Sequence, residues 1–385
     1  MSSGPSGSEI PLARHDVRPE DVAAVVSVLE GDRLALGPWA ERFERAVADY
    51  VGVRHAVATN SGTSALHLIV RALGIGSGDE VITTPFSFIA STNAILFEGG
   101  TPVFVDIDPE TLCIDPAGAE RAITPRTKAI LAVDVFGRPA DWPALESIAD
   151  RHGLALIEDS AEALGADLGG RRCGSFGRAA IFGFYPNKQI TTGEGGMVVT
   201  DDADLAGVCR SMANQGRDAG ASWLQHIRLG FNYRMSESTA ALGVSQFTRI
   251  EEIVSARREI ALGYAEALAG IDGLILPTEP GGAANVSWFV YVVRLTEAFT
   301  REDRDAILEA LRTRGIGCGD YFQPIHLQPY LRKTLGTGPG DCPITEAIGE
   351  RTIALPFYVG LTPIERAEVA DALRDAIADR SRRDR

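Results

Sequence analysis

Short apolar runs alternate with segments of helical character between residues 54 and 201, and this alternation restricts the fold more than any other feature of the chain. The runs expected to be strands are HAVATNS, DEVITTP, TPVFVDI, KAILAVDV, LALIEDS, AIFGFY and GMVVTDD. Between them, TSALHLIVRALG and DWPALESIADRHG carry apolar residues at helical spacing. Such alternation predicts an α/β fold, in which a mainly parallel sheet has helices on both faces. Ligands of these folds bind at the carboxyl ends of the strands.

A second, smaller domain is expected beyond the segment NYRMSE, where the alternation stops. Apolar residues at Val244, Phe247, Ile250 and Val254 are spaced as in one long helix that leads into this domain. We therefore divide the chain into a flexible tail over residues 1–13, a large domain over residues 14–248 and a small α+β domain over residues 249–385.

The small domain carries its own strand and helix signals. SWFVYVVRL predicts a strand, and TREDRDAILEALRTRG predicts a helix that is opened by Thr300 and closed by Gly315. The last helix begins with TPIE, where Thr362 is the cap, Pro363 lies in the first turn and Glu365 is the reciprocal capping partner.

Composition excludes several classes of function. With 37 Lys plus Arg against 52 Asp plus Glu, the formal charge of −15 argues against a nucleic-acid or anionic-membrane partner. The five cysteines show no CxxC pair or metal-ligand spacing, which favours reduced thiols in a cytoplasmic protein without a metal site. No apolar run approaches the roughly 20 residues of a membrane helix, and MSSGPSGSEI lacks the basic and apolar regions of a signal peptide.

An anion site is one interpretation of ATNSGTSALHL, where a strand should run into a helix. The free backbone N–H groups of a helix start attract anions, Gly62 permits close approach, and Thr63 and Ser64 add hydroxyl donors. An ordinary helix cap accounts for the same residues.

An aspartate and a lysine can point into the same crevice, although the aspartate taken alone is also explained as a solvated strand terminus. Asp159 ends the apolar strand LALIED, and Lys188 follows the next strand along the chain in FYPNK. A carboxylate and a lysine beside a phosphate site suit pyridoxal phosphate, whose aldehyde links to lysine and whose pyridine nitrogen pairs with an acid. Phe88, which follows another strand, is either a ring that stacks on this cofactor or a core aromatic.

Five segments together resemble the DegT/DnrJ/EryC1/StrS family of sugar aminotransferases and occur in that family's order. They are NSGTSALHL, PFSFIASTNA, IEDSAEALGA, FYPNKQITTGEGGMVVTDD and GFNYRMSE. The resemblance implies an aspartate aminotransferase-like fold (fold type I) and a homodimer with shared active sites. It also implies transfer of an amino group, with glutamate as the expected donor, to a keto group on a nucleotide-linked sugar.

The resemblance also assigns roles to individual residues. Lys188 matches the Schiff-base lysine, Asp159 the partner of the pyridine nitrogen and Asn232 an asparagine that reaches the phosphate from the neighbouring subunit. The remaining matches are the phosphate-binding Gly62, Thr63 and Ser64, the ring-stacking Phe88, and Tyr321 and His326, whose segment lines the nucleotide-sugar side of the site in similar proteins.

Two positions depart from the family pattern. Gly183 stands where many members carry a phosphate-binding serine, so either another group supplies that bond or the cofactor is held less tightly. Glu162 stands where many members have glutamine or histidine near the cofactor's phenolic oxygen, and a carboxylate there must be protonated or turned away. Members similar to the perosamine synthases share this acid, which favours amination at carbon 4 of a 6-deoxysugar.

Two other functions remain open from the sequence. One is an enzyme of the same fold that acts on a cyclitol ketone or an amino acid. The other is a regulator that binds the cofactor without turnover, which the presence of Lys188 and Asp159 disfavours.

Overall fold

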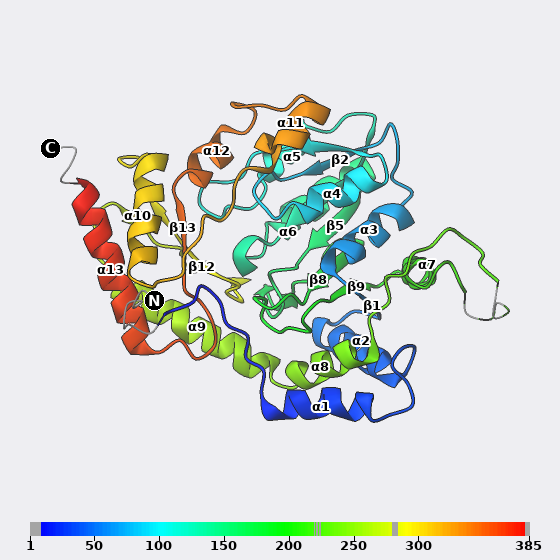
Figure 1. The fold of residues 1–385 in the computed structure, drawn as a ribbon. Coiled ribbons are helices and arrows are strands. Elements are labelled where there is room, and N and C mark those ends of the chain that lie inside the picture. The colour runs from blue at the N-terminus through cyan, green and yellow to red at the C-terminus, as the bar shows by residue number, and fades with distance from the viewer. Residues whose placement is uncertain (1–8, 219, 221, 223–224, 279–283, 382–385) are drawn as a thin grey trace.

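All seven strands predicted between residues 54 and 201 are present and form one sheet (Figure 1). The computed structural model describes residues 9–381, except 219, 221, 223–224 and 279–283. The strands of the sheet are β1 (His55–Thr59), β2 (Glu80–Thr83), β3 (Thr101–Phe104), β4 (Thr127–Val133), β5 (Ala155–Asp159), β8 (Ala179–Gly183) and β9 (Gly196–Thr200).

The sheet has the order β1-β9-β8-β5-β4-β2-β3. Neighbours from β3 to β8 are parallel, whereas β9 is antiparallel to both β8 and β1. The prediction of a mainly parallel sheet is therefore confirmed. The helices around this sheet are α1 (Pro19–Leu29), α2 (Pro38–Val51), α3 (Gly62–Ala72), α4 (Ala90–Phe97), α5 (Pro116–Arg121), α6 (Trp142–His152), α7 (Ala203–Ala213) and α8 (Glu237–Phe247), with one short 3-10 turn, η1 (Val135–Gly137).

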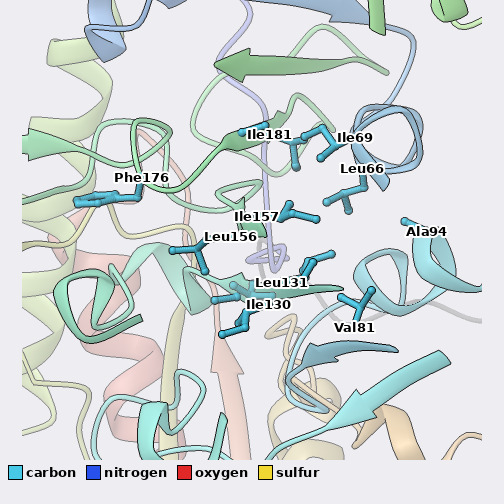
Figure 2. Close-up of a cluster of buried hydrophobic side chains, with 14 of the residues drawn as sticks. Leu66, Ile69, Val81, Ala94, Ile130, Leu131, Leu156, Ile157, Phe176 and Ile181 are labelled. Carbon is cyan, nitrogen blue, oxygen red and sulfur yellow. The ribbon is translucent and has the colours of Figure 1, made fainter. Parts of the chain in front are cut away.

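Burial of both faces explains why the strands are continuous apolar runs. Along β8, Ile181 packs into the core that contains α3, whereas Phe182 packs on the other face into the core of α2 and α8. Figure 2 shows Leu66 and Ile69 of α3 directed at the side chains of the sheet. Successive residues of a strand point to opposite faces, so a sheet covered on both sides needs apolar side chains at every position.

The C-terminal part of the chain forms a smaller unit around an antiparallel sheet of order β10-β12-β13. Thr300 caps α10 in a reciprocal box with Asp303, and Thr362 and Glu365 form the expected box before α13. Elements outside the large sheet are α9 (Ile250–Ala267), β10 (Leu274–Ile275), β12 (Tyr291–Leu295), α10 (Arg301–Thr313), η2 (Ile325–Leu327), α11 (Pro329–Leu335), α12 (Pro343–Gly349), β13 (Thr352–Leu355), α13 (Pro363–Ser381) and the short sheet of β11 (Ala284–Asn285), β6 (Asp167–Leu168) and β7 (Arg171–Arg172).

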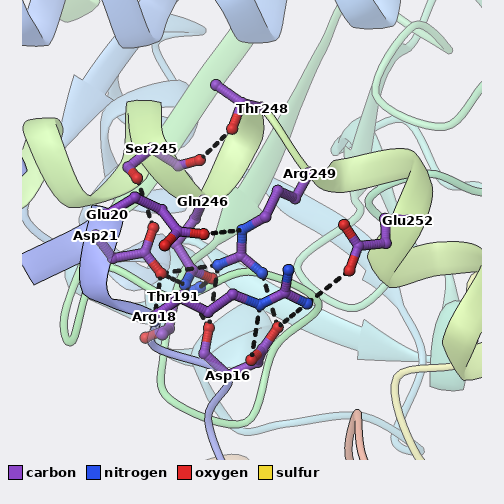
Figure 3. A network of polar contacts seen from close by, with 10 residues as sticks. All are labelled: Asp16, Arg18, Glu20, Asp21, Thr191, Ser245, Gln246, Thr248, Arg249 and Glu252. Atoms are coloured by element: carbon purple, nitrogen blue, oxygen red, sulfur yellow. Dashed lines mark hydrogen bonds and ion pairs between the residues drawn. The ribbon is translucent and has the colours of Figure 1, made fainter.

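The single long helix predicted through Val244 and Val254 is wrong, because the chain forms two helices that break at Thr248 and Arg249. Arg249 leaves helical geometry with φ −111° and ψ 14°. Its guanidinium donates to Asp21 at 2.8 Å and to Asp16 at 2.7 Å, within the polar network of Figure 3. The break therefore lets one arginine bind two acids from the N-terminal segment.

The chain around Ile10 packs into the smaller unit. Ile10 is buried in that core, forms a parallel bridge with Ile316, and donates its N–H to the Gly315 carbonyl at 3.0 Å. The flexible tail expected over residues 1–13 thus does not extend through Ile10, and residues 1–8 of it lie outside the described residues. Helix α9 contributes Ile253 to the core of α2 and α8 and Tyr264 to the second core, so the division at residue 248 stays a prediction.

The cysteines are free thiols, as expected; Cys318 is half-buried, and the buried ones are Cys113, Cys173, Cys209 and Cys342. Among the described residues, no helix combines the length and the apolar character needed to cross a membrane.

Asp21 offers a test of the network in Figure 3. Burial alone would raise the pKa of this carboxyl, but hydrogen bonds from Ser245, the Arg18 backbone and Gln246, with the charge of Arg249, lower it. Asp21→Asn should lower the free energy of unfolding by about 3 kcal/mol at neutral pH, measured by urea denaturation, because it leaves a buried guanidinium short of one partner. A group whose pKa is lowered by folding stabilises above its unfolded pKa, so the difference should shrink as the pH falls through the folded-state value.

The control is Asp371→Asn, which removes the exposed partner of Arg374 on α13. Its effect should stay within about 0.5 kcal/mol. Equal losses in the two variants would contradict a stabilising role for the buried network.

Candidate active site

The first turn of α3 lies directly against the ends of β8 and β9. A Cβ atom added to Gly196 would come within 2.4 Å of the Ser61 backbone, and one added to Gly62 would lie 3.4 Å from the Gly183 Cα. Position 196 therefore admits no side chain. This close packing holds the helix start at the edge of the sheet where β4, β5 and β8 end.

The helix start presents two backbone donors. Ser61 is the cap, because its Oγ accepts from the Ser64 N–H at 3.1 Å, and the Ser64 hydroxyl donates to Asn60 Oδ1 at 2.7 Å. Among the described residues, the N–H groups of Gly62 and Thr63 have no assigned acceptor. The helix cap predicted for this segment is therefore present, the Ser64 hydroxyl already has a partner, and the anion site stays a prediction.

Asp159 ends β5 and is buried. Its Oδ2 accepts from the Ser91 hydroxyl at 2.7 Å and its Oδ1 from the Ala161 N–H at 3.1 Å. Burial raises the pKa of Asp159, and these two hydrogen bonds and the charge of Lys188 offset part of that rise. The carboxylate is therefore held in a fixed orientation near the lysine.

Lys188 lies on the loop after β8, with its side chain 14% exposed. Its Nζ is 3.5 Å from Glu162 Oε1 and 3.9 Å from the centroid of the Phe289 ring. The other Glu162 oxygen accepts from the Phe136 N–H at 2.9 Å. Burial raises the pKa of Glu162, while the Lys188 charge and the Phe136 N–H lower it. Glu162 thus faces both Lys188 and the Phe136 N–H, and its orientation relative to the cofactor's phenolic oxygen stays a prediction.

Phe88 and Tyr321 differ in their surroundings. Phe88 is 63% exposed, so it is not the core aromatic that the sequence left open; Phe86, two residues earlier, is the buried ring. Tyr321 is half-buried and stacks on Phe322 with ring centroids 5.3 Å apart. Burial and the nearby charge of Glu162 raise the pKa of Tyr321, which places its hydroxyl in the electrostatic range of the site.

His326 is not near an open surface. The side chain is fully buried, and its Nε2 lies 2.9 Å from Glu346 Oε1. Backbone N–H groups of Gly340 and Cys342 also donate to Glu346. The ring is therefore enclosed and joined to the loop that precedes α12, and the expected contact of His326 with substrate stays a prediction.

Asn232 is exposed and lies beside the helix start of its own chain. Its carbonyl accepts from Asn60 Nδ2 at 3.4 Å, and the neighbouring Tyr233 carbonyl accepts from the Asn60 N–H at 2.8 Å. The reach of its side chain to a partner's site remains a prediction.

Gly183 has room for a larger residue. A Cβ atom there would meet Ala161 Cβ at 3.5 Å, an ordinary van der Waals contact. The absence of the family's serine at this position is thus not imposed by packing, and the open N–H groups of Gly62 and Thr63 lie on the segment packed against it.

Several contacts of the site were not predicted. Ser91, which holds Asp159, lies one helical turn beyond Phe88 in a segment already noted. Phe289 was expected only as part of a strand, and no local pattern distinguishes it. Gln189 donates to the Glu162 carbonyl at 2.5 Å and to Ser287 Oγ at 2.7 Å, a link between segments that are distant in the sequence.

A buried pair of acids lies behind Asp159. The Ser160 hydroxyl is 2.5 Å from Asp134 Oδ2 and 2.7 Å from Glu158 Oε1. Burial raises the pKa of both acids, and the charge of Asp134 raises that of Glu158 further. Cys173 lies close enough to make a possible metal-ligand group, but protein donors already occupy the oxygens of both carboxylates.

The comparisons with known proteins cover nearly the whole chain. The model of the DegT/DnrJ/EryC1/StrS aminotransferase family matches residues 15–374. The GDP-perosamine synthase of Caulobacter vibrioides is 41% identical over 339 residues, which are 88% of this chain and 90% of that protein.

Two solved structures have closely similar folds. Helicobacter pylori PseC, an aminotransferase in pseudoaminic acid biosynthesis, gives a TM-score of 0.92 at 30% identity, covering 97% of this chain and all of that one. The PLP form of the sugar aminotransferase Spr1654 from Streptococcus pneumoniae, described as putative, gives 0.92 at 26% identity and covers 96% and 99%.

These similarities confirm the aspartate aminotransferase-like fold (fold type I) that the resemblance implied. The chain belongs to the DegT/DnrJ/EryC1/StrS aminotransferase family.

Proposed function

We propose that this protein is a pyridoxal-phosphate-dependent aminotransferase that moves an amino group from glutamate to carbon 4 of a nucleotide-linked keto-6-deoxysugar. The observation that carries the proposal is the position of Lys188. Its amine lies beside Glu162 and Phe289, and its charge offsets part of the rise in pKa of the buried Asp159. The chain has two other lysines, Lys128 and Lys333, and both are exposed.

The residues present fit the cofactor. The N–H groups of Gly62 and Thr63 suit a phosphate, and the exposed Phe88 has a free ring face for stacking. Asn187, the neighbour of Lys188, has a buried Oδ1 without a hydrogen-bond partner among the described residues, as expected of a group that meets a ligand. When bound, pyridoxal phosphate supplies an aldehyde that links to amines and a ring that takes up electrons.

Each residue then has a definite task. With the cofactor bound, the Asp159 carboxylate, oriented by Ser91 and the Ala161 N–H, would pair with the ring nitrogen. Lys188 would hold the cofactor through its Nζ and would carry a proton on that atom during amino transfer. Glu162 holds the lysine amine in place through its Oε1.

The finer assignment of substrate rests on similarity. Glu162 is the acid shared with members similar to the perosamine synthases, and a GDP-perosamine synthase is a close relative over most of the chain. With a formal charge of −15, the protein must bind the phosphates of a nucleotide sugar through local donors. We propose a homodimer with shared active sites, in which Asn232 of one subunit contacts the phosphate held by the other.

The substrate proposal is tested with glutamate and 4-keto-6-deoxysugars linked to dTDP, UDP or GDP, with product stereochemistry determined by NMR. We expect amination of one of these sugars and parallel double-reciprocal lines, because one cofactor must accept the amine before the second substrate reacts. Transfer only to a free cyclitol ketone would replace the sugar assignment. Absence of any half-reaction with amino donors would favour a regulator.

Lys188→Ala should lower turnover by at least about a hundredfold, since the variant lacks the group that moves the proton. It should remain folded and bind pyridoxal phosphate without a covalent link. Borohydride treatment of the wild type followed by peptide mass analysis should find the label on Lys188. The matched controls Lys128→Ala and Lys333→Ala should keep wild-type activity, and a label on either of these lysines would overturn the assignment.

The shared site is tested by mixing Lys188→Ala and Asn232→Ala chains, refolding them together and measuring activity at limiting cofactor. In a mixed dimer one site carries both defects and the other has an intact lysine and an intact asparagine. With random exchange, about a quarter of wild-type activity should reappear. If mass spectrometry shows mixed dimers but activity is only the average of the two variants, Asn232 serves its own subunit.

A further inference from the structure

Arg257, on α9, is a buried arginine without an acid partner. Its side chain is 3% exposed, and within the described residues no carboxylate pairs with it. Burial lowers the pKa of Arg257 to about 10. The nearest compensation from a side chain is the ring of Phe357, whose centroid lies 5.4 Å from the guanidinium carbon. A guanidinium placed in the interior at this cost is expected to have a specific task.

The hydrogen bonds of Arg257 all go to the backbone of the active site. One nitrogen, Nη2, donates to the Lys188 carbonyl at 3.2 Å. The other, Nη1, donates to the carbonyls of Trp288 at 3.1 Å and Phe289 at 3.2 Å. The planar fork of one guanidinium therefore joins the loop that carries the lysine amine to the segment that carries the ring beneath it.

This junction determines where the amine lies. The ring of Phe289 is 3.9 Å from Lys188 Nζ, so the Lys188 side chain meets the segment that Arg257 holds, while the Lys188 carbonyl is bound by Arg257 itself. The same two segments meet again where Gln189 donates to Ser287 Oγ. We propose that Arg257 is a positioning residue, which fixes the backbone of Lys188 and Phe289 together so that the lysine amine stays between the Phe289 ring and Glu162.

The proposal rests on the proposed role of Lys188 as the lysine that links to pyridoxal phosphate. It predicts that loss of the fork displaces the amine and slows its reaction, because a misplacement of about 1 Å in a reacting group lowers rates by about a hundredfold. Lysine at position 257 keeps a charge but not the planar fork, so it should not restore the geometry.

The test is the rate at which added pyridoxal phosphate becomes linked to Lys188 in the full-length protein freed of cofactor. The amine nitrogen bonds to the aldehyde carbon, the carbonyl oxygen leaves as water, and borohydride then adds hydride to give a stable secondary amine. Peptide mass analysis measures the label. Arg257→Met and Arg257→Lys should both slow labelling of Lys188 by about 10- to 100-fold.

A second measurement separates positioning from a general effect on the site. In the Lys188→Ala background the cofactor binds without a covalent link. Adding Arg257→Met there should change the dissociation constant of pyridoxal phosphate by less than about twofold. A 10- to 100-fold loss of affinity for pyridoxal phosphate in this background would show that Arg257 supports the whole site. That result would overturn the proposal.

Arg304 provides a matched control. It is 2% exposed and donates to the carbonyls of Gly349 at 3.2 Å and Thr352 at 3.4 Å, all within the smaller unit. Arg304→Met should destabilise the protein but leave the rate of Lys188 labelling unchanged. Equal labelling rates in wild type and both Arg257 variants would refute the positioning role. Failure of the wild type to label at Lys188 would instead refute the proposed function.

Discussion

The contact between the first turn of α3 and Gly196 is the constraint on which the active site depends. Because no side chain fits between the Ser61 backbone and Gly196, the helix start lies on the sheet itself rather than above a layer of side chains. The N–H groups of Gly62 and Thr63 therefore lie at the edge of the sheet where β5 ends at Asp159 and where β8 leads into the loop that carries Lys188. In a protein of strongly negative net charge, such fixed dipoles are what the proposed phosphate site relies on.

Around that contact, the electrostatics are set by burial more than by pairing. Glu158, Asp159 and Glu162 are all buried near the end of β5, and burial is the largest cause of the rise in pKa of each. Glu158 faces away into an acid pair, whereas Asp159 and Glu162 share the influence of one lysine. Acids with different partners thus lie within five residues of sequence, and Glu162 is the one that pairs with Lys188.

Hydrophobic periodicity and capping motifs predicted the helices and strands that depend on residues close in the sequence. The strand LALIED, the box at Thr300 and the box at Thr362 depend on periodicity and capping, and all are confirmed. The break after α8 depends on Arg249 finding Asp21, which is 228 residues away, and periodicity carries no information on such a pair.

The same distinction applies to the site. Asp159 ends one predicted strand and Lys188 follows the next, so the sequence indicated that both lie at the same edge of the sheet. The structure brings the two residues together. Phe289 and Arg257 enter from segments that the helix and strand patterns describe only as core. His326 was chosen by resemblance alone, and no local pattern indicated that its ring is fully buried against the half-buried Glu346.

The bridge between Ile10 and Ile316 has a consequence for the synthesis of the chain. The ribosome makes all strands of the large sheet before it reaches residue 316. Ile10 therefore lacks its bridge partner, Ile316, during most of translation. Phe289 likewise emerges after the lysine loop, which leaves the amine of Lys188 facing water in the nascent chain. A cofactor that reacts with amines therefore meets an unfinished site until the last third of the protein has been made, and capture of the cofactor is expected to follow release.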